Sequence, residues 1–438
     1  MVIDTLIKAR WVIPVEPIGV VLEHHALVLQ SGRIIDILPS DEAERMYVAR
    51  HIHDLPHHAV LPGFINAHTH VPMTLFRGMA DDLPLMDWLQ NKIWPAEAEW
   101  VKPDFVADGA RLGIAEMLRG GTTCFADMYF YPEIVAQVVR DSGIRACLGT
   151  PVLDFPTAWA QNSDEYISKG LALHDEVHND ALLTTLFGPH APYTVSDEPF
   201  RKLLTYANEL DIPITCHVHE TAFEVEQAVA QSGQRPLARL HALGLLSSGF
   251  AAVHMTTLTD EEIALLASTG THVVHCPESN LKLASGFCPV AKLLAAGVNV
   301  ALGTDGAASN NDLDMLGEMR TAALLAKTVA QDATAVPAAQ ALRMATLNGA
   351  KALGLGDITG SLEAGKAADI IAINLDHLRT QPLYDPISQI VYAASSDQVS
   401  DVWIAGKHVL QNAQLTTLDE TQIKQRASEW RARIYTPA

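Results

Sequence analysis

The sequence predicts an α/β fold in which a (β/α)₈ TIM-type barrel is combined with a small β-sandwich domain formed by both chain ends. Three observations support this prediction. Short apolar runs alternate eight times with helical patterns in the middle of the chain, β-rich segments flank that middle, and histidines or carboxylates recur where the apolar runs end. A doubly wound open sheet is the structural alternative.

The composition limits the possible partners. The 438 residues are 48% hydrophobic and 18% charged, which allows a large core and excludes disorder. A formal net charge of -21 argues against nucleic acid, whose phosphates would be repelled, and favours a neutral or cationic small molecule. No apolar run reaches the ~20 residues of a membrane span, and no signal-peptide pattern is present. The five cysteines form no C-x-x-C pair, so we expect a cytoplasmic protein without a membrane partner.

Both ends of the chain carry short strand patterns separated by turn signals. Strands are expected over residues 6–14, 26–30 and 34–38, and again over residues 368–374 and 399–410. We expect residues 1–58 and 361–438 to form one composite sheet domain, with the barrel of residues 59–360 inserted between them. Two unrelated β caps are the alternative.

The barrel strands are short apolar runs in the middle of the chain. They are expected over residues 59–66, 121–127, 145–150, 181–187, 213–219, 250–254, 271–275 and 298–304. Helical patterns run between them, as over residues 104–119 and 197–210, the second preceded by a Ser-Asp cap signal.

Polar side chains follow several of these strands at their carboxyl ends, where such a barrel places its chemistry. His68 and His70 follow the first strand and, being two residues apart in extended chain, point to the same side. The later strands end in His190, in His217 with His219 and Glu220, in His254, and in Asp305. Because these ends converge on the barrel axis, the sequence predicts a metal site there.

Three imidazoles and a carboxylate with an open position suit one divalent metal per chain. Zn²⁺ is expected first, with Fe²⁺, Mn²⁺ or Co²⁺ as alternatives. Such a metal would lower the pKa of a bound water toward ~7 and supply hydroxide. Glu220 could carry a proton to a substrate nitrogen, although a solvent-exposed glutamate at a helix N-terminus is the alternative. The fourth strand contains no Lys that could bridge two metals, so a mononuclear site is expected.

Five motifs indicate a family. They are PGFINAHTH at residues 62–70, GPHAPY at 188–193, HVHET at 217–221, SNLKLASG at 279–286 and GTDGAASNN at 303–311. The chain is similar to the amidohydrolase superfamily over nearly its whole length. It resembles the 5'-methylthioadenosine/S-adenosylhomocysteine deaminase branch, which the last three motifs favour over cytosine or guanine deaminases.

The resemblance implies roles for the strand-end residues. The metal ligands would be His68, His70, His217 and Asp305. Asp305 would also accept a proton from the metal-bound water, Glu220 would pass protons to the purine ring nitrogen, and His254 would orient the hydroxide and stabilise the tetrahedral intermediate.

The resemblance also implies residues that contact the substrate. Trp88 and Glu97 follow the first strand, and the carboxylate of Glu97 would hold the ribose hydroxyls. His190, Glu220 and Ser309 would contact the nucleoside as well. Without the resemblance, Trp88 reads equally well as a core residue and Glu97 as a surface residue.

One departure from the family pattern concerns the substrate. Members that act on S-adenosylhomocysteine carry two Arg in and after the third strand, suited to clamping a carboxylate. Residues 147–162 contain no Arg here and instead present Val152, Leu153, Phe155 and Trp159. This favours a methylthio tail, with adenosine as a possible substrate. Alternatively, the loop packs on a neighbouring subunit, which could donate an Arg.

The expected reaction is hydrolytic deamination at the purine 6-position by metal-bound hydroxide, converting 5'-methylthioadenosine to 5'-methylthioinosine with release of ammonia, as in purine salvage. Alternatives are S-adenosylhomocysteine or adenosine deamination, then guanine deamination or an s-triazine chlorohydrolase activity. A non-catalytic scaffold on this fold is the alternative from a different class. A homo-oligomer, dimer or tetramer, is expected.

Overall fold

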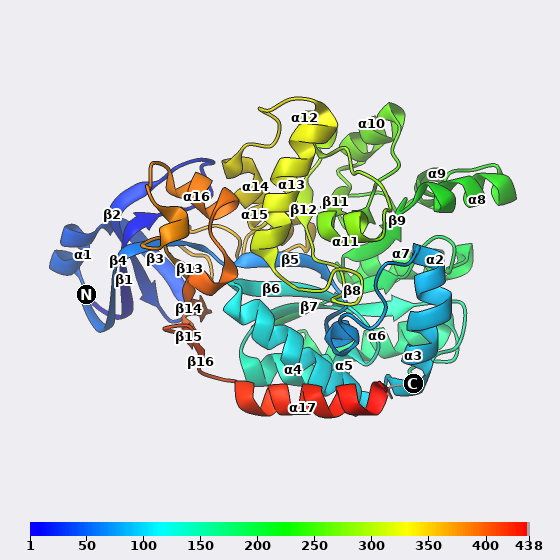
Figure 1. The fold of residues 1–438 in the computed structure, drawn as a ribbon, viewed down its shortest axis with the longest axis horizontal. Coiled ribbons are helices and arrows are strands. Elements are labelled where there is room, and N and C mark those ends of the chain that lie inside the picture. The colour runs from blue at the N-terminus through cyan, green and yellow to red at the C-terminus, as the bar shows by residue number, and fades with distance from the viewer. Residues whose placement is uncertain (436–438) are drawn as a thin grey trace.

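The computed structural model describes residues 1–435 and contains two eight-stranded sheets. One is a parallel barrel surrounded by helices, and the other lies beside it and is built from both chain ends (Figure 1). The predicted fold class is therefore confirmed.

The barrel strands follow one another in sequence order. They are β5 (Phe64–Thr69), β6 (Thr122–Met128), β7 (Arg145–Val152), β8 (Leu183–Pro189), β9 (Ile214–Val218), β10 (Phe250–His254), β11 (His272–His275) and β12 (Val300–Leu302). Each pairs in parallel with its neighbour. The ends of the series meet where the Asp305 N–H donates to the His68 carbonyl at 3.0 Å, which brings the first and last strands together.

Helices surround the barrel and connect its strands through loops. They are η1 (Val71–Phe76), α2 (Leu85–Trp88), η2 (Leu89–Ile93), α3 (Trp94–Trp100), α4 (Pro103–Arg119), α5 (Pro132–Ser142), α6 (Ser163–Val177), α7 (Asp197–Leu210), α8 (Ala222–Ser232), α9 (Pro236–Ala242), α10 (Asp260–Thr269), α11 (Pro277–Lys282), α12 (Val290–Ala295), α13 (Met315–Ala330), α14 (Ala338–Met344) and α15 (Leu347–Ala352). The two predicted helices appear as α4 and α7. Ser196 occupies the N-cap of α7, but its side chain makes no capping hydrogen bond.

The second sheet has the strand order β16-β15-β14-β13-β4-β1-β2-β3. Its strands are β1 (Val2–Val12), β2 (Leu22–Gln30), β3 (Arg33–Pro39), β4 (Val48–Pro62), β13 (Ile370–Asn374), β14 (Val399–Ile404), β15 (Lys407–Gln411) and β16 (Gln414–Leu415). The helices between these strands in sequence are α1 (Ser40–Met46), η3 (Leu378–Thr380), α16 (Pro386–Tyr392) and η4 (Ser396–Gln398). Hydrogen bonds join all eight strands into one sheet. Separate apolar clusters lie around Ile7 and Trp403 and around Leu6 and Leu38.

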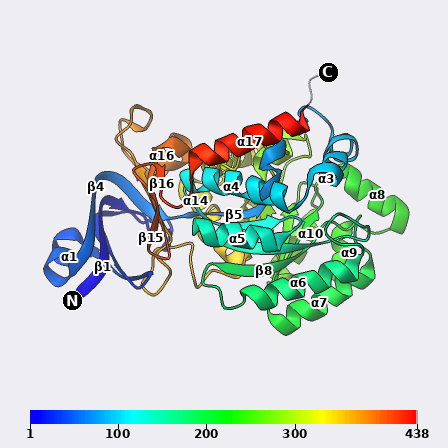
Figure 2. The same ribbon diagram turned by 90° about the horizontal axis from the view of Figure 1, so that it is seen from below.

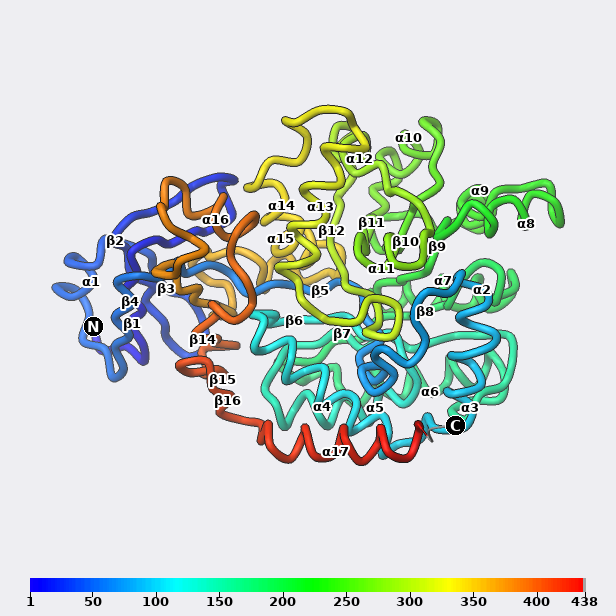
Figure 3. Tube along the Cα trace, in the orientation of Figure 1, coloured from blue at the N-terminus to red at the C-terminus, as the bar shows by residue number. Residues whose placement is uncertain are grey.

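The strand predicted over residues 59–66 is two strands. Residues up to Pro62 belong to β4 and pair with β13, whereas β5 starts at Phe64 (Figure 3). Gly63 stands between them, where a Cβ would lie 2.1 Å from the Thr123 side chain. The division of the chain at residues 58 and 361 stays a prediction, and the pairing supports a first boundary at Gly63 instead.

The last helix, α17 (Glu420–Ile434), packs on the barrel and not on the terminal sheet. It lies along α4 (Figure 2). The buried Trp430 ring lies edge-on to Phe105 at 5.3 Å, and its indole N–H donates to Asp108 Oδ2 at 2.9 Å. None of the helices in residues 1–435 is long and apolar enough to cross a membrane.

Candidate metal centre and active site

Four potential metal ligands meet at the carboxyl ends of the barrel strands. One ligand atom from each of His68, His70, His217 and Asp305 lies within 4.8 Å of all the others. His68 Nε2 is 3.1 Å from His217 Nε2, and His70 Nε2 is 3.2 Å from Asp305 Oδ1. The structure thus brings together the ligand set expected from the sequence. Three imidazole nitrogens and one carboxylate oxygen form a donor set that suits Zn²⁺ or Fe²⁺.

Neighbouring carbonyl groups hold the far side of two of the histidine ligands. His70 Nδ1 donates to the Met128 carbonyl and His217 Nδ1 to the His190 carbonyl, each at 2.6 Å. Both rings therefore present Nε2 to the cluster. Such outer hydrogen bonds fix the tautomer and orientation of metal-binding histidines.

The Asp305 carboxylate is held in the same way. Its Oδ2 accepts hydrogen bonds from the hydroxyls of Ser279 and Ser309, both at 2.7 Å, so that Oδ1 faces the histidines. Ser309 was expected to contact the substrate. It lines the cavity, but its hydroxyl donates to Asp305.

The backbone is strained at the ends of three strands. His219, His254 and Asp305 have φ angles of +52°, +75° and +63°. Residues with a Cβ rarely adopt this left-handed backbone conformation, and such strain is common at functional sites. It turns the chain sharply where the strand-end side chains must enter the cavity.

Glu220 and His254 face one another beside the ligand cluster. Their nearest atoms, Glu220 Oε1 and His254 Nε2, are 3.9 Å apart. His254 Nδ1 donates to Asn280 Oδ1 at 2.9 Å, which leaves Nε2 directed at the cavity. Burial raises the pKa of Glu220, and this favours a proton on its carboxyl group. The alternative of a solvent-exposed Glu220 is wrong, because the residue is buried.

The cluster opens into a cavity of about 530 Å³, a size typical of sites for small molecules. Trp88, Glu97 and His190 line it. The Glu97 carboxylate accepts from the Tyr129 hydroxyl at 2.7 Å, and burial raises the pKa of Glu97 to about 7. Trp88 is 5% exposed, and its indole N–H is buried without a hydrogen-bond partner in the described residues.

Comparison with known proteins shows the family of the chain. The sequence pattern of the amidohydrolase family matches residues 59–409. The chain belongs to the amidohydrolase family. A 5-methylthioadenosine/S-adenosylhomocysteine deaminase of Saccharophagus degradans is 51% identical over 431 residues, which are 98% of this chain and 97% of that protein. This relative confirms the branch resemblance predicted from the motifs.

Two solved structures extend the comparison. An adenosine deaminase from Xanthomonas campestris with bound zinc has a TM-score of 0.98 and 54% identity, covering 99% of both chains. Atrazine chlorohydrolase from Arthrobacter aurescens, complexed with zinc, has a TM-score of 0.91 at 24% identity, covering 97% of this chain and 99% of that chain. The second likeness is one of fold.

The cavity of this amidohydrolase has an apolar wall as well as its potential metal ligands. Leu153 and Phe155 line it, as expected. Val152 and Trp159 do not. Val152 is fully buried in β7, and Trp159 packs against Tyr166 while its indole N–H donates to Glu133. The predicted loop packing on a neighbouring subunit is thus unnecessary to bury Trp159. Among the described residues, no Arg or Lys lines the cavity.

Three groups that hold the amidohydrolase site were not identified from the sequence. Ser279 and Asn280 lie in the SNLKLASG motif, which gave the family but not their partners Asp305 and His254. Glu224 accepts the backbone N–H of Glu220 at 2.7 Å. No sequence signal distinguishes it from an ordinary glutamate in the first turn of a helix.

Proposed function

We propose that this amidohydrolase deaminates 5'-methylthioadenosine hydrolytically at the purine 6-position, giving 5'-methylthioinosine and ammonia. The observation that carries the proposal is the composition of one cavity. It combines the His and Asp cluster, Glu220 and His254 with an apolar wall, and no Arg or Lys is among its described lining residues. The names of the bacterial relative and of the Xanthomonas structure support a deaminase that acts on an adenosine-type nucleoside.

The metal is proposed to be one Zn²⁺ per chain, with Fe²⁺ as the alternative. His68, His70, His217 and Asp305 would hold it. When bound, it lowers the pKa of a coordinated water and so supplies a nucleophile near neutral pH. The zinc in the Xanthomonas structure supports this assignment.

The proton transfers are assigned to residues of the chain. Glu220 protonates the purine ring nitrogen next to the reacting carbon, a role that its raised pKa supports. Asp305 accepts one proton of the attacking water, and this proton passes through the Glu220 carboxylate to the departing ammonia. The other proton of the water restores the Glu220 carboxyl group. His254, with its Nε2 directed at the cavity, stabilises the charge that develops on the oxygen at the purine 6-position.

The remaining lining residues bind the nucleoside. The Glu97 carboxylate accepts from the ribose hydroxyls, the unpartnered indole N–H of Trp88 donates to the ligand, and His190 contacts the nucleoside. Leu153 and Phe155 surround the methylthio group. A zwitterionic amino-acid tail would find no cation there, and its carboxylate would be desolvated without a partner.

The test is kcat/KM on metal-replete protein for 5'-methylthioadenosine, S-adenosylhomocysteine, adenosine and guanine. We expect 5'-methylthioadenosine to exceed S-adenosylhomocysteine by at least about tenfold, or ~1.4 kcal/mol. Preference for the homocysteine compound would contradict the argument from the cation-free wall. Turnover of guanine alone would overturn the assignment to this branch.

The Glu220→Gln variant tests the proton carrier. The amide retains the volume of the side chain but cannot transfer a proton, so we expect turnover to fall by at least about 10²-fold. The metal content should stay near one ion per chain in both proteins, as measured by elemental analysis. Wild-type activity in this variant would remove Glu220 from the mechanism.

A homo-oligomer, either a dimer or a tetramer, stays part of the proposal. Leu378 and Tyr384 are 93% and 90% exposed on the loop between β13 and α16. The loop is anchored because the buried Thr380 hydroxyl donates to the Leu375 carbonyl at 2.7 Å. A fixed loop that presents large apolar side chains supports a protein contact. Mass by light scattering tests it, and a monomeric mass would contradict it.

A further inference from the structure

The peptide backbone around Glu220 is held from two sides. On the N–H side, Glu224 Oε2 accepts the Glu220 N–H at 2.7 Å and Glu224 Oε1 accepts the His219 N–H at 3.1 Å. On the carbonyl side, the Thr256 hydroxyl lies 2.9 Å from the backbone carbonyl oxygen of Glu220 and 3.1 Å from that of His219. The Thr256 N–H also donates to the His219 oxygen at 2.9 Å.

The side chains of Glu224 and Thr256 come from different elements. Glu224 lies in the first turn of α8, whose N-cap Thr221 accepts the Glu224 N–H. Thr256 follows β10 and stands two residues after His254. The clamp of Glu224 and Thr256 therefore joins the turn that carries Glu220 to the turn that carries His254.

The clamp acts where the backbone is least able to hold its own shape. His219 has a φ of +52°, and Met255, which precedes Thr256, has a φ of +51°. Residues in this conformation are strained and persist only where surrounding contacts determine them. Glu224 is 8% exposed, so its carboxylate has little water to bind and depends on the two N–H groups.

We propose that Thr256 and Glu224 are positioning residues for Glu220, which they fix in the orientation that lets its carboxyl group reach both the purine ring and the leaving ammonia. This inference rests on the proposed role of Glu220 as proton carrier. Neither residue lines the cavity, so neither contacts the substrate. A misplacement of about 1 Å in a catalytic group is enough to cost on the order of 10²-fold in rate.

The test compares Thr256→Val with Thr256→Ser. Val keeps the shape of Thr but loses the hydroxyl that holds the Glu220 carbonyl, whereas Ser keeps the hydroxyl. We expect kcat for Thr256→Val to fall by about 10- to 100-fold, while KM stays within about twofold and metal content is unchanged. Thr256→Ser should retain kcat within about threefold of the wild type.

Glu224→Gln gives a second measurement, because its amide can accept only one of the two N–H groups and turns an NH₂ toward the other. It too should lose kcat more than it raises KM. If this variant does not fold, the Thr256 pair alone decides. Equal losses in Val and Ser, a loss of metal in Thr256→Val, or a wild-type kcat in that variant would overturn the inference.

The wild type separates the two levels of the argument. If it turns over none of the four test compounds, the proposed function fails, whatever the variants do. If it is active and Thr256→Val matches it, only the positioning inference fails. The comparison holds for whichever nucleoside the wild type prefers, since neither Thr256 nor Glu224 lines the cavity.

Discussion

At the scale of single residues, three histidines of the site owe their direction to a partner on the far side of the ring. Carbonyls of Met128 and His190 orient two histidines, and Asn280 orients His254. These partners lie at or after strands other than the one they serve. The arrangement of the centre is therefore a property of neighbouring strands acting in pairs.

Glu97 gives a pH prediction at this scale. Burial is the main cause that raises its pKa, to about 7, against the hydrogen bond from Tyr129 that lowers it. Because the ionised form is the better acceptor for ribose hydroxyls, binding should weaken as pH falls through this pKa. We expect the Kd for 5'-methylthioinosine, measured by calorimetry, to rise by up to about tenfold between about pH 8 and about pH 6.

Glu97→Gln is the control for this pH effect. The amide does not titrate. The variant should therefore bind 5'-methylthioinosine with a larger Kd than the wild type at high pH, and this Kd should be nearly constant over the same pH range. A wild-type Kd that is flat across this range would argue against a ribose contact by the Glu97 carboxylate.

At the scale of elements, Lys282 in α11 contacts two loops, one before α2 and one after β12. Its ammonium group is 2.7 Å from Asp81 Oδ1, 3.3 Å from the Ala308 carbonyl, and in contact with Asn311 Oδ1. Asp81 leads into α2, which carries Trp88, whereas Ala308 precedes Ser309. Lys282 thus fixes the segment that leads to Trp88, which we propose to cover the nucleoside, against the turn that carries Asp305.

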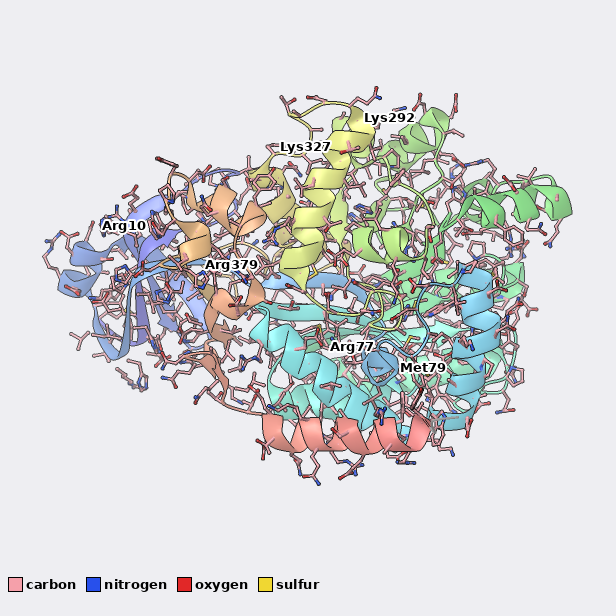
Figure 4. The ribbon with its side chains drawn as sticks, viewed as in Figure 1. Arg10, Arg77, Met79, Lys292, Lys327 and Arg379 are labelled. Atoms are coloured by element: carbon pink, nitrogen blue, oxygen red, sulfur yellow. The ribbon has the colours of Figure 1, made fainter. Side chains whose placement is uncertain are left out.

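We expect Lys282→Met to raise KM by about 3- to 10-fold with kcat within about twofold, because the covering segment loses its anchor while the proton carriers stay in place. Steady-state kinetics measure both constants. Lys292→Met is the matched control, because Lys292 pairs with Asp260 at 2.7 Å on the exposed surface of α12, away from α2 and α3 (Figure 4). A fall in kcat with unchanged KM would contradict this role of Lys282.

The barrel strands were predictable from the sequence because each is a short apolar run bounded by turn residues. The junction at Gly63 was not, since residues 59–66 form one apolar run and only the pairing partners differ. The ligand types followed from the strand-end histidines and the family motifs. The loop after β7 was harder, because sequence does not show that Trp159 turns into the core while Phe155 lines the cavity.

Contacts between residues distant in sequence account for most of what remained hidden. Asp305 accepts the hydroxyl of Ser279 from α11, and α17 returns to pack on α4. Neither pairing leaves a local pattern, because each partner satisfies local rules for a loop or a helix on its own.

At the scale of the whole molecule, a buried ion pair joins the barrel to the terminal sheet. Arg145, at the start of β7, forms two hydrogen bonds of 2.8 and 3.2 Å with Asp369, just before β13. The side chains are 6% and 0% exposed. Asp369 also accepts the Ala405 N–H at 2.8 Å, so three segments depend on its charge.

Arg145→Met should lower the free energy of unfolding by about 3 to 5 kcal/mol, because it leaves the Asp369 carboxylate buried without its cation. Chemical denaturation measures this loss, and kcat per folded molecule should be unchanged. In Arg45→Met, which removes a surface pair with Asp41, the change should stay within about 0.5 kcal/mol. Equal stabilities of the two variants would show that the buried pair contributes no more to the free energy of unfolding than a surface pair does.

The central position of β4 has a consequence for biosynthesis. One edge of β4 pairs with β1, which precedes it, but the other pairs with β13, which follows the whole barrel in sequence. Chains fold progressively as they leave the ribosome, and an unpaired strand edge invites association with other chains. A chain whose synthesis stops before Ile370 therefore has this edge open, and the strand that carries His68 follows β4 directly after Gly63.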